Sequence, residues 1–168
     1  MNEDGSTLYF SSKKYGGVGG YDLWQTSFIN DKEWSVPTNL YKPINSSGNE
    51  CSPSISSDGN FMYFSRVSVV GMSGGDCGNI YVSERRGTTW GEAKALPSPI
   101  NMGCESSPFI HADSKTLYFS SKRAGGKGKL DLYLSKKYPN FVCSNPIGIE
   151  VLNTPEDDQF ISMDAREN

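Results

Sequence analysis

The sequence predicts a nearly all-β protein built from three similar units, and three observations support this prediction. Glycine and proline, which interrupt regular structure, number 18 and 9 among the 168 residues, and 12% of the chain is aromatic. No stretch keeps apolar residues at helical spacing over the roughly ten positions that a helix needs. The third observation is an internal repeat of about 54 residues, which decides the architecture.

A Tyr-Phe-Ser tripeptide anchors the repeat, beginning at Tyr9, Tyr63 and Tyr118 with steps of 54 and 55 residues. Each copy follows a turn signal, Asp-Gly in the first two copies and Asp-Ser in the third. Two further landmarks recur downstream in the same order. They are Asp22-Leu23-Trp24, Asn79-Ile80-Tyr81 and Asp131-Leu132-Tyr133, then Pro43-Ile44-Asn45, Pro99-Ile100-Asn101 and Val151-Leu152-Asn153.

Each unit contains four short segments with strand character. In the middle unit, residues 52–56 alternate up to an Asp-Gly turn, residues 61–65 are β-rich, residues 79–83 alternate again, and a segment led by Trp90 follows. Four antiparallel strands in ~40–50 residues are typical of a propeller blade, which buries its faces against neighbouring blades. We therefore expect three four-stranded antiparallel blades in one domain. The expected repeats cover about 1–49, 50–104 and 105–155, with 156–168 starting a further blade or closing the ring.

The repeat resembles the WD-repeat-like propeller repeat typified by the periplasmic protein TolB. The motifs that carry this resemblance are Glu-x-Ser-Pro-x-Ile-Ser-x-Asp-Gly-x-x-x-Tyr-Phe-Ser, Gly-Gly-x-Gly-x-x-Asp-Leu-Tyr, a Trp and Pro-Ile-Asn, and they span nearly the whole chain. The resemblance implies a binding or scaffolding propeller without a common active site. It also implies a periplasmic or other cell-envelope protein, of a kind that often carries an OmpA-like domain.

Composition narrows the expected partners. The net charge of −3 and pI of about 5.2 give no electrostatic footprint for nucleic acid. No run approaches the roughly 18–20 apolar residues of a membrane span. We therefore expect a protein partner or a cell-envelope component, no nucleic acid, no membrane span and no cofactor.

The two ends of the chain suggest how the ring is completed. Residues 1–5 already form the first turn, and residues 158–164 resemble an inner strand without a blade behind it. Three arrangements fit this register: an excerpt of a longer propeller, a homodimer that completes blades into a six-bladed ring, or an independent three-blade unit. We favour the first arrangement. An unpaired strand edge invites aggregation, which favours the first two arrangements over the third.

Four cysteines and one histidine make a metal site improbable. Cys51, Cys77, Cys104 and Cys143 include no Cys-x-x-Cys pair. Blade topology places the first three near one face of the disc and Cys143 in an outer strand. We favour free thiols, with a Cys77–Cys104 or Cys77–Cys51 disulfide as the alternative, and we expect a structural role for His111.

Three glutamates recur at the entrance of the expected inner strands, namely Glu50, Glu105 and Glu156. They would form part of an acidic ring that binds a cation, a basic peptide or a hydroxyl-rich ligand. The alternative, which we favour, is that they hold backbone amides at the blade junctions. A competing function is a propeller glycosidase or sialidase, for which Glu50 and Glu105 are the acid/base pair.

Basic residues flank the glycine-rich loops on the same expected face. They are Lys13, Lys14, Lys122, Arg123, Lys127 and Lys129. We expect a partner-binding surface over residues 14–21, 66–78 and 123–130, with Lys14, Arg123 and Lys127 as its basic side chains. A solvated loop rim is the alternative.

No catalytic constellation emerges. Ser73 lies in a Gly-x-Ser-x-Gly match, but this segment leads into another strand and not into the helix that a nucleophile elbow requires. Asp22 and Asp131 are explained by hydrogen bonds to the glycine-rich loops, and Trp34 and Trp90 by packing between blades. The sequence therefore predicts a non-catalytic binding or scaffolding module.

Overall fold

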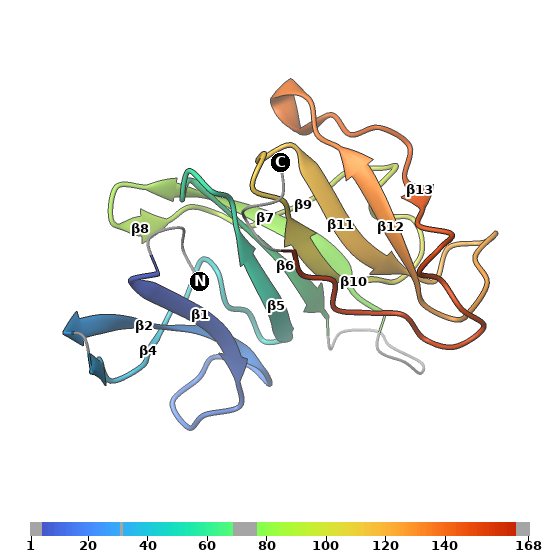
Figure 1. Ribbon diagram of the computed structural model, residues 1–168. Coiled ribbons are helices and arrows are strands. Elements are labelled where there is room, and N and C mark those ends of the chain that lie inside the picture. The colour runs from blue at the N-terminus through green and yellow to red at the C-terminus, as the bar shows by residue number, and fades with distance from the viewer. Residues whose placement is uncertain (1–4, 31, 69–76, 164–168) are drawn as a thin grey trace.

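The computed structural model describes residues 5–30, 32–68 and 77–163, which form three antiparallel sheets placed side by side (Figure 1). The first contains β1 (Thr7–Ser12), β2 (Asp22–Asn30), β3 (Glu33–Trp34) and β4 (Thr38–Asn39). The second contains β5 (Asn49–Ile55), β6 (Phe61–Val67), β7 (Asn79–Arg86), β8 (Thr89–Trp90) and β9 (Lys94–Ala95). The third contains β10 (Glu105–Ile110), β11 (Thr116–Ser121), β12 (Asp131–Lys136) and β13 (Ile147–Gly148).

Strand order confirms the predicted all-β, propeller-type architecture. The second and third sheets run β5-β6-β7-β8 and β10-β11-β12-β13, with β9 also paired to β7. The first sheet runs β1-β2-β3, with β4 also paired to β2, so the described residues supply it with no strand equivalent to β5 or β10. One short 3₁₀ helix, Pro139–Phe141, interrupts the strands. No helix in the described part of the chain has the length and apolar character needed to cross a membrane. We call the three sheets blades 1, 2 and 3.

The Tyr-Phe-Ser motif forms the second strand position of every blade and sets the same register each time. Phe64 in β6 pairs with Tyr81, and Phe119 in β11 pairs with Tyr133. Their rings stack with centroids 5.9 and 6.2 Å apart. Cross-strand aromatic pairs of this kind stabilise a sheet, which explains why the repeat keeps them.

Each hydrophobic core is shared by two successive blades. The first core combines Tyr9 and Leu23 of blade 1 with Met62 and Phe64 of blade 2. The second combines side chains of blades 2 and 3, namely Tyr63, Ile80, Val82, Leu96, Ile100, Ile110, Leu117, Phe119 and Tyr133. Blades thus bury their faces against one another, as the propeller prediction requires.

The two tryptophans differ in how they pack. Trp90 is 8% exposed and meets the ring of Tyr9 from the preceding blade edge-on, with centroids 6.0 Å apart. The inter-blade role predicted for Trp90 is therefore confirmed. Trp34 is 38% exposed, and its ring contact is with Phe28 of its own blade.

The side-chain amide of the asparagine that ends each Pro-Ile-Asn or Val-Leu-Asn motif makes two hydrogen bonds to the backbone of one strand residue, as a neighbouring strand would. The Asn45 amide accepts from Leu23 N at 2.8 Å and donates to Leu23 O at 2.9 Å. Asn101 makes the same pair of bonds with Ile80, and Asn153 makes them with Leu132. A side-chain amide therefore satisfies both polar groups of one residue in β2, β7 and β12.

Asn45→Ala is expected to lower the free energy of unfolding by about 2 kcal/mol, because it removes the acceptor of the buried Leu23 N–H, while the Leu23 carbonyl keeps its hydrogen bond from Leu40 N. Asn45 is 2% exposed and also donates to Asn39 Oδ1 at 2.8 Å. Urea unfolding measures the effect. The exposed Asn145→Ala serves as the control and is expected to change stability by less than about 0.5 kcal/mol. Equal effects of the two substitutions would contradict this account.

The turn before β11 contains a carboxylate held in its ionised form. Asp113 accepts from Lys115 N at 2.8 Å, from Thr116 N at 2.7 Å and from Thr116 Oγ1 at 2.6 Å. Burial raises the pKa of Asp113, but these hydrogen bonds and nearby His111 outweigh it and hold the pKa well below its ordinary value.

Since the folded-state pKa of Asp113 is depressed, its contribution to stability is present above the unfolded pKa of about 4 and is lost as pH falls further. We expect the stability difference between the native chain and Asp113→Asn to shrink steadily from pH 5 to pH 2. Denaturant titrations at each pH measure it. A difference that stays constant over this range would show that the hydrogen bonds do not depend on the charge.

Candidate functional site

Glu50 lies at the junction between blades 1 and 2, with its carboxylate fully buried. It accepts from Arg66 Nε at 2.8 Å and from Ser46 Oγ at 2.5 Å. Arg66 also donates to the carbonyl of Ile44 in the preceding blade at 2.6 Å, and its guanidinium lies 4.3 Å from the ring centroid of Tyr81. The ion pair therefore joins the inner strand, the second strand and the previous blade.

Glu105 occupies the equivalent place between blades 2 and 3, at the start of β10. One oxygen of this fully buried carboxylate accepts from Gly103 N at 2.7 Å, Ser121 Oγ at 3.0 Å and Met102 N at 3.2 Å, with Arg123 at 3.4 Å. Arg123 donates to the carbonyl of Ile100 at 2.7 Å, which repeats the contact that Arg66 makes with the preceding blade. Burial lowers the pKa of Arg123, and Glu105 opposes that shift.

These contacts decide what Glu50 and Glu105 can do in this conformation. Both carboxylates are fully buried. A ligand would have to displace Arg66 and the Ser46 hydrogen bonds to reach Glu50, whereas at Glu105 the Oε2 atom has no hydrogen-bond partner but is shielded from solvent. Neither glutamate lines a described cavity. A ligand-binding ring and a glycosidase pair at these positions remain predictions that this arrangement does not favour.

Asp158, and not Glu156, lies at the position equivalent to Glu50 and Glu105. Asp158 N donates to Leu130 O, as Glu50 N donates to Tyr21 O. The Asp158 carboxylate accepts from Thr154, as that of Glu50 accepts from Ser46. The equivalence expected for Glu156 is therefore wrong by two positions.

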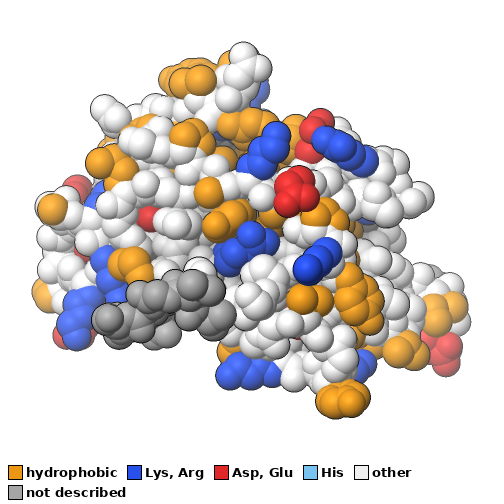
Figure 2. All heavy atoms as spheres, turned by 180° about the vertical axis from the view of Figure 1, so that it is seen from behind, with side chains coloured by type: hydrophobic (Ala, Val, Ile, Leu, Met, Phe, Trp, Pro, Cys, Tyr) orange, Lys and Arg blue, Asp and Glu red, His pale blue; other side chains and the backbone are white. Residues whose placement is uncertain are grey.

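The three basic side chains expected to bind a partner all have intramolecular contacts. The ammonium of Lys14 lies 5.3 Å from the ring centroid of Trp24, and Arg123 engages Glu105. Lys127 Nζ donates to the carbonyl of Glu150 at 2.6 Å and lies 3.3 Å from its carboxylate. On the face shown in Figure 2, Lys and Arg side chains lie scattered among uncharged and hydrophobic ones.

The glycine-rich loops are shaped by an aspartate at the start of the following strand. Asp22 accepts from Val18 N at 2.7 Å, and Asp131 accepts from Lys127 N at 2.9 Å. This confirms the predicted structural role of both aspartates. A Cβ at Gly17 or Gly126 would collide with the same carboxylate, so glycine is required by the close approach.

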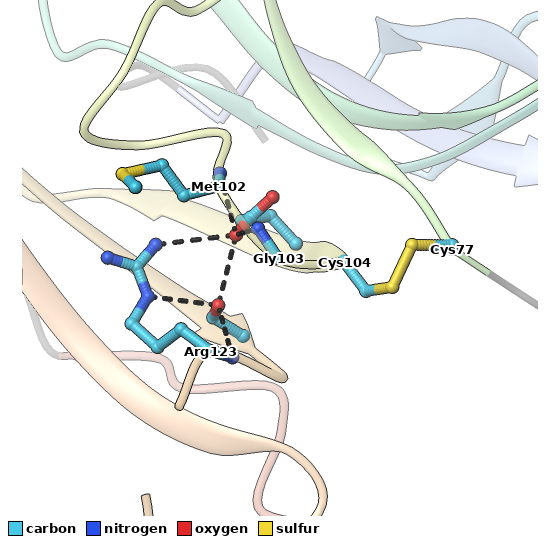
Figure 3. Close-up of a disulfide and its surroundings, with 7 residues drawn as sticks. Cys77, Met102, Gly103, Cys104 and Arg123 are labelled. Carbon is cyan, nitrogen blue, oxygen red and sulfur yellow. Dashed lines mark hydrogen bonds and ion pairs between the residues drawn. A yellow bond between two sulfur atoms is a disulfide. The ribbon is translucent and has the colours of Figure 1, made fainter. Parts of the chain in front are cut away.

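Two of the four cysteines are oxidised. A disulfide joins Cys77 to Cys104 and links the loop before β7 to the start of β10 (Figure 3). The preference for free thiols is wrong for this pair, while Cys51 and Cys143 are free. Burial, and secondarily Glu50, raises the pKa of the Cys51 thiol. Ser73 and the loop residues 69–76 lie outside the described residues.

A cavity of about 520 Å³ opens where the inner strands of blades 2 and 3 meet the end of β1 and residues 157–160. We call it the inner-strand cavity. Its lining residues are Lys13, Tyr21, Asn49, Cys51, Ser52, Ser65, Val67, Cys104, Ser106, Ser107, Lys122, Leu130, Asp157, Gln159 and Phe160. A second cavity of about 380 Å³ continues along residues 52–55, 107–110 and 160–162.

The charge in the inner-strand cavity comes from equivalent positions of two blades. Lys13 and Lys122 each follow the second strand of their blade, and both are exposed. Lys13 Nζ lies 4.6 Å from the ring centroid of Tyr21. Asp157 is the one carboxylate among the lining residues, and its Oδ1 already accepts from Leu130 N at 3.1 Å. The described residues contain no group of three acidic, His or Cys side chains arranged to hold a metal.

Comparison with solved structures identifies the fold. TolB from Acinetobacter baumannii matches with a TM-score of 0.56 and 16% identity, over 86% of this chain and 30% of that one. A structure reported as TolB from Agrobacterium tumefaciens matches with a TM-score of 0.57 and 17% identity, over 81% of this chain and 40% of that one. The chain has a TolB-like β-propeller fold.

The TolB-like chain spans 30% and 40% of the length of these two structures. No protein-family model and no curated protein sequence matches it. The sequence predicts Lys14 and Arg123 as binding side chains, whereas the neighbouring Lys13 and Lys122 line the cavity of this TolB-like fold. Both pairs share an offset of 109 residues, so the repeat alone does not distinguish them.

Proposed function

We propose that this chain is a non-catalytic binding module whose inner-strand cavity takes an extended, carboxylate-bearing segment of a protein partner. The observation that carries the proposal is the pair of exposed cations, Lys13 and Lys122, at one cavity. Glu50 and Glu105 are neutralised by their own arginines, so the cavity favours an anionic ligand. The lining residues Tyr21, Val67 and Phe160 offer apolar contact for the side chains between the ligand's carboxylates.

Fluorescence anisotropy with a labelled decapeptide of alternating Glu and Leu tests this proposal, with Gln-Leu and Lys-Leu decapeptides as comparisons. Only the Glu peptide is expected to bind, and its affinity should fall as salt rises. The double variant Lys13→Gln, Lys122→Gln is expected to weaken binding by roughly tenfold or more.

The matched control is Lys115→Gln, an exposed lysine in the turn before β11 that does not line this cavity. It should leave the affinity unchanged. Equal binding of the Glu and Gln peptides, or equal effects of the control and the double variant, would refute the proposed ligand class.

We also infer that the protein works in the periplasm or elsewhere in the cell envelope, with a protein or other envelope component as partner. The Cys77–Cys104 disulfide supports this, since such bonds persist in oxidising compartments. The TolB-like fold is in keeping with it. Rapid alkylation in cells followed by denaturation and mass measurement tests the inference. Two labelled thiols, from Cys51 and Cys143, are expected, and four would contradict an envelope location.

A further inference from the structure

The segment 158–163 already has the backbone of an inner strand. The N–H of Asp158 donates to Leu130 O at 2.8 Å, just as Glu50 N in β5 donates to Tyr21 O and Glu105 N in β10 donates to Gly78 O. Both β5 and β10 contain a register shift with a left-handed serine inside it, Ser52 at φ 53° and Ser107 at φ 49°. Phe160 adopts φ 61° at the equivalent place.

A left-handed phenylalanine is uncommon, because its Cβ crowds the backbone. Its presence at this place shows that the segment follows the inner-strand path of blades 2 and 3 without being assigned to a strand. The Phe160 side chain is 72% exposed, while Phe160, Ile161 and Ser162 line a cavity with β5 and β10. The backbone of residues 158–163 therefore already has the conformation that β5 and β10 have where they pair with the second strand of their blades.

Blade 1 has a second strand, β1, whose inner edge corresponds to the edges that pair with the inner strands in blades 2 and 3. One edge of β6 pairs with β5, and one edge of β11 pairs with β10. In the described residues, no strand pairs with the corresponding edge of β1 over residues 8–11. Lys14 lies over the Trp24 ring as Arg66 lies over Tyr81 and Arg123 over Tyr133. The cation of the junction is in place on blade 1. The carboxylate of Asp158, in the segment 158–163, is the group that would pair with such a cation.

The outer hairpins show a second complementary pair of surfaces. Arg85 and Trp90 of blade 2 pack on Tyr9 of blade 1, with Arg85 Nη2 donating to the Tyr9 hydroxyl at 3.3 Å. The same position in blade 3 carries Lys137, whose ammonium lies 4.8 Å from the Phe61 ring centroid and 5.8 Å from that of Tyr63. Each hairpin therefore covers the second strand of the preceding blade.

In blade 1 the equivalent hairpin pair is Phe28 and Trp34, whose rings meet at 4.1 Å and are 42% and 38% exposed. The outer end of blade 1 lies at the right edge of Figure 2, where hydrophobic side chains reach the surface. In blade 3 the tyrosine equivalent to Tyr9 is the half-buried Tyr118, which contacts Phe109 and His111. Figure 1 places these two surfaces on opposite outer blades.

We propose that a second copy of this chain joins the two surfaces. Segment 158–163 of one copy pairs with the β1 edge of the other, which places Asp158 beside the other copy's Lys14. The Phe28–Trp34 hairpin of that other copy packs on Tyr118 of the first. A two-fold axis makes this junction twice and closes a ring of six blades, a size within the range of closed propellers.

Sedimentation of the 168-residue chain tests the proposal, and a dimer is the expected result. Trp34→Glu and Tyr118→Glu should each weaken association by roughly 100-fold, because both junctions of a variant dimer then contain a buried charge. Mixing the two variants is expected to recover dimers, since one junction of the mixed dimer contains both substitutions and the other contains none. Recovery also shows that both variants are folded.

Ile29→Glu is the matched control, because Ile29 is 65% exposed and takes no part in the Phe28–Trp34 ring contact. It should leave the dimer intact. A second test exchanges the charges: Lys14→Glu and Asp158→Lys should each weaken the dimer about tenfold, and the double variant should restore it. A monomer at all concentrations, or a dimer indifferent to Trp34→Glu and Tyr118→Glu, overturns the proposal. These outcomes do not depend on the ligand of the inner-strand cavity.

Discussion

Glu50→Ala is expected to lower the free energy of unfolding by about 3–5 kcal/mol, the largest effect of any single substitution considered for this chain. The carboxylate is fully buried and lies 2.8 Å from Arg66 Nε, so its removal leaves a largely buried guanidinium without its countercharge. Ser46 also loses the acceptor for its hydroxyl and its backbone amide. Urea unfolding followed by tryptophan fluorescence measures the change.

Two further variants distinguish the loss of the Glu50–Arg66 ion pair from an unspecific effect of substituting a glutamate. Replacing both partners with apolar residues, Glu50→Leu with Arg66→Met, is expected to recover part of the loss, because no unpaired charge then remains. Glu156→Ala alters an exposed glutamate and should change stability by less than about 0.5 kcal/mol. If Glu50→Ala costs no more than Glu156→Ala, the junction does not depend on this pair.

Removal of the disulfide is expected to lower the free energy of unfolding by about 2–4 kcal/mol. The bond between Cys77 and Cys104 closes a loop across 27 positions of sequence and ties blade 2 to the inner strand of blade 3. The variant Cys77→Ser, Cys104→Ser removes it, and unfolding with and without dithiothreitol measures the effect in the native chain.

The two free cysteines supply the control for the disulfide. Cys51→Ser, Cys143→Ser should unfold near the native midpoint and should keep its sensitivity to dithiothreitol. The variant without Cys77 and Cys104 should lose that sensitivity. A native chain whose midpoint is unchanged by dithiothreitol would show that the bond contributes little to folding.

Most of the fold could be predicted from the internal repeat of the sequence. The Tyr-Phe-Ser motif and the landmarks after it predicted strands whose register the structure repeats, because cross-strand aromatic pairs and shared cores place the same demand on every blade. The Asp22 and Asp131 loop contacts followed from the same regularity. Local pattern and tertiary packing agree at these positions.

The junctions were harder to predict, because long side chains reach one place from different positions. Arg66 pairs directly across from Glu50, whereas in blade 3 Ser121 holds that register and Arg123 arrives from two residues later. A position-by-position alignment of the repeats hides this equivalence. The disulfide was equally hidden, since its pairing depends on where a loop approaches the next blade.

The sharing of each core by two blades has a consequence for local opening. Blade 2 contributes to both hydrophobic clusters, while blades 1 and 3 each contribute to one. Opening an outer blade exposes a single cluster, but opening the middle blade exposes both and leaves its neighbours without support. In a single, unassociated copy of the chain, amide hydrogens of β6 and β7 are therefore expected to be the last to exchange with solvent deuterium, and order is expected to be lost from the two outer blades inward.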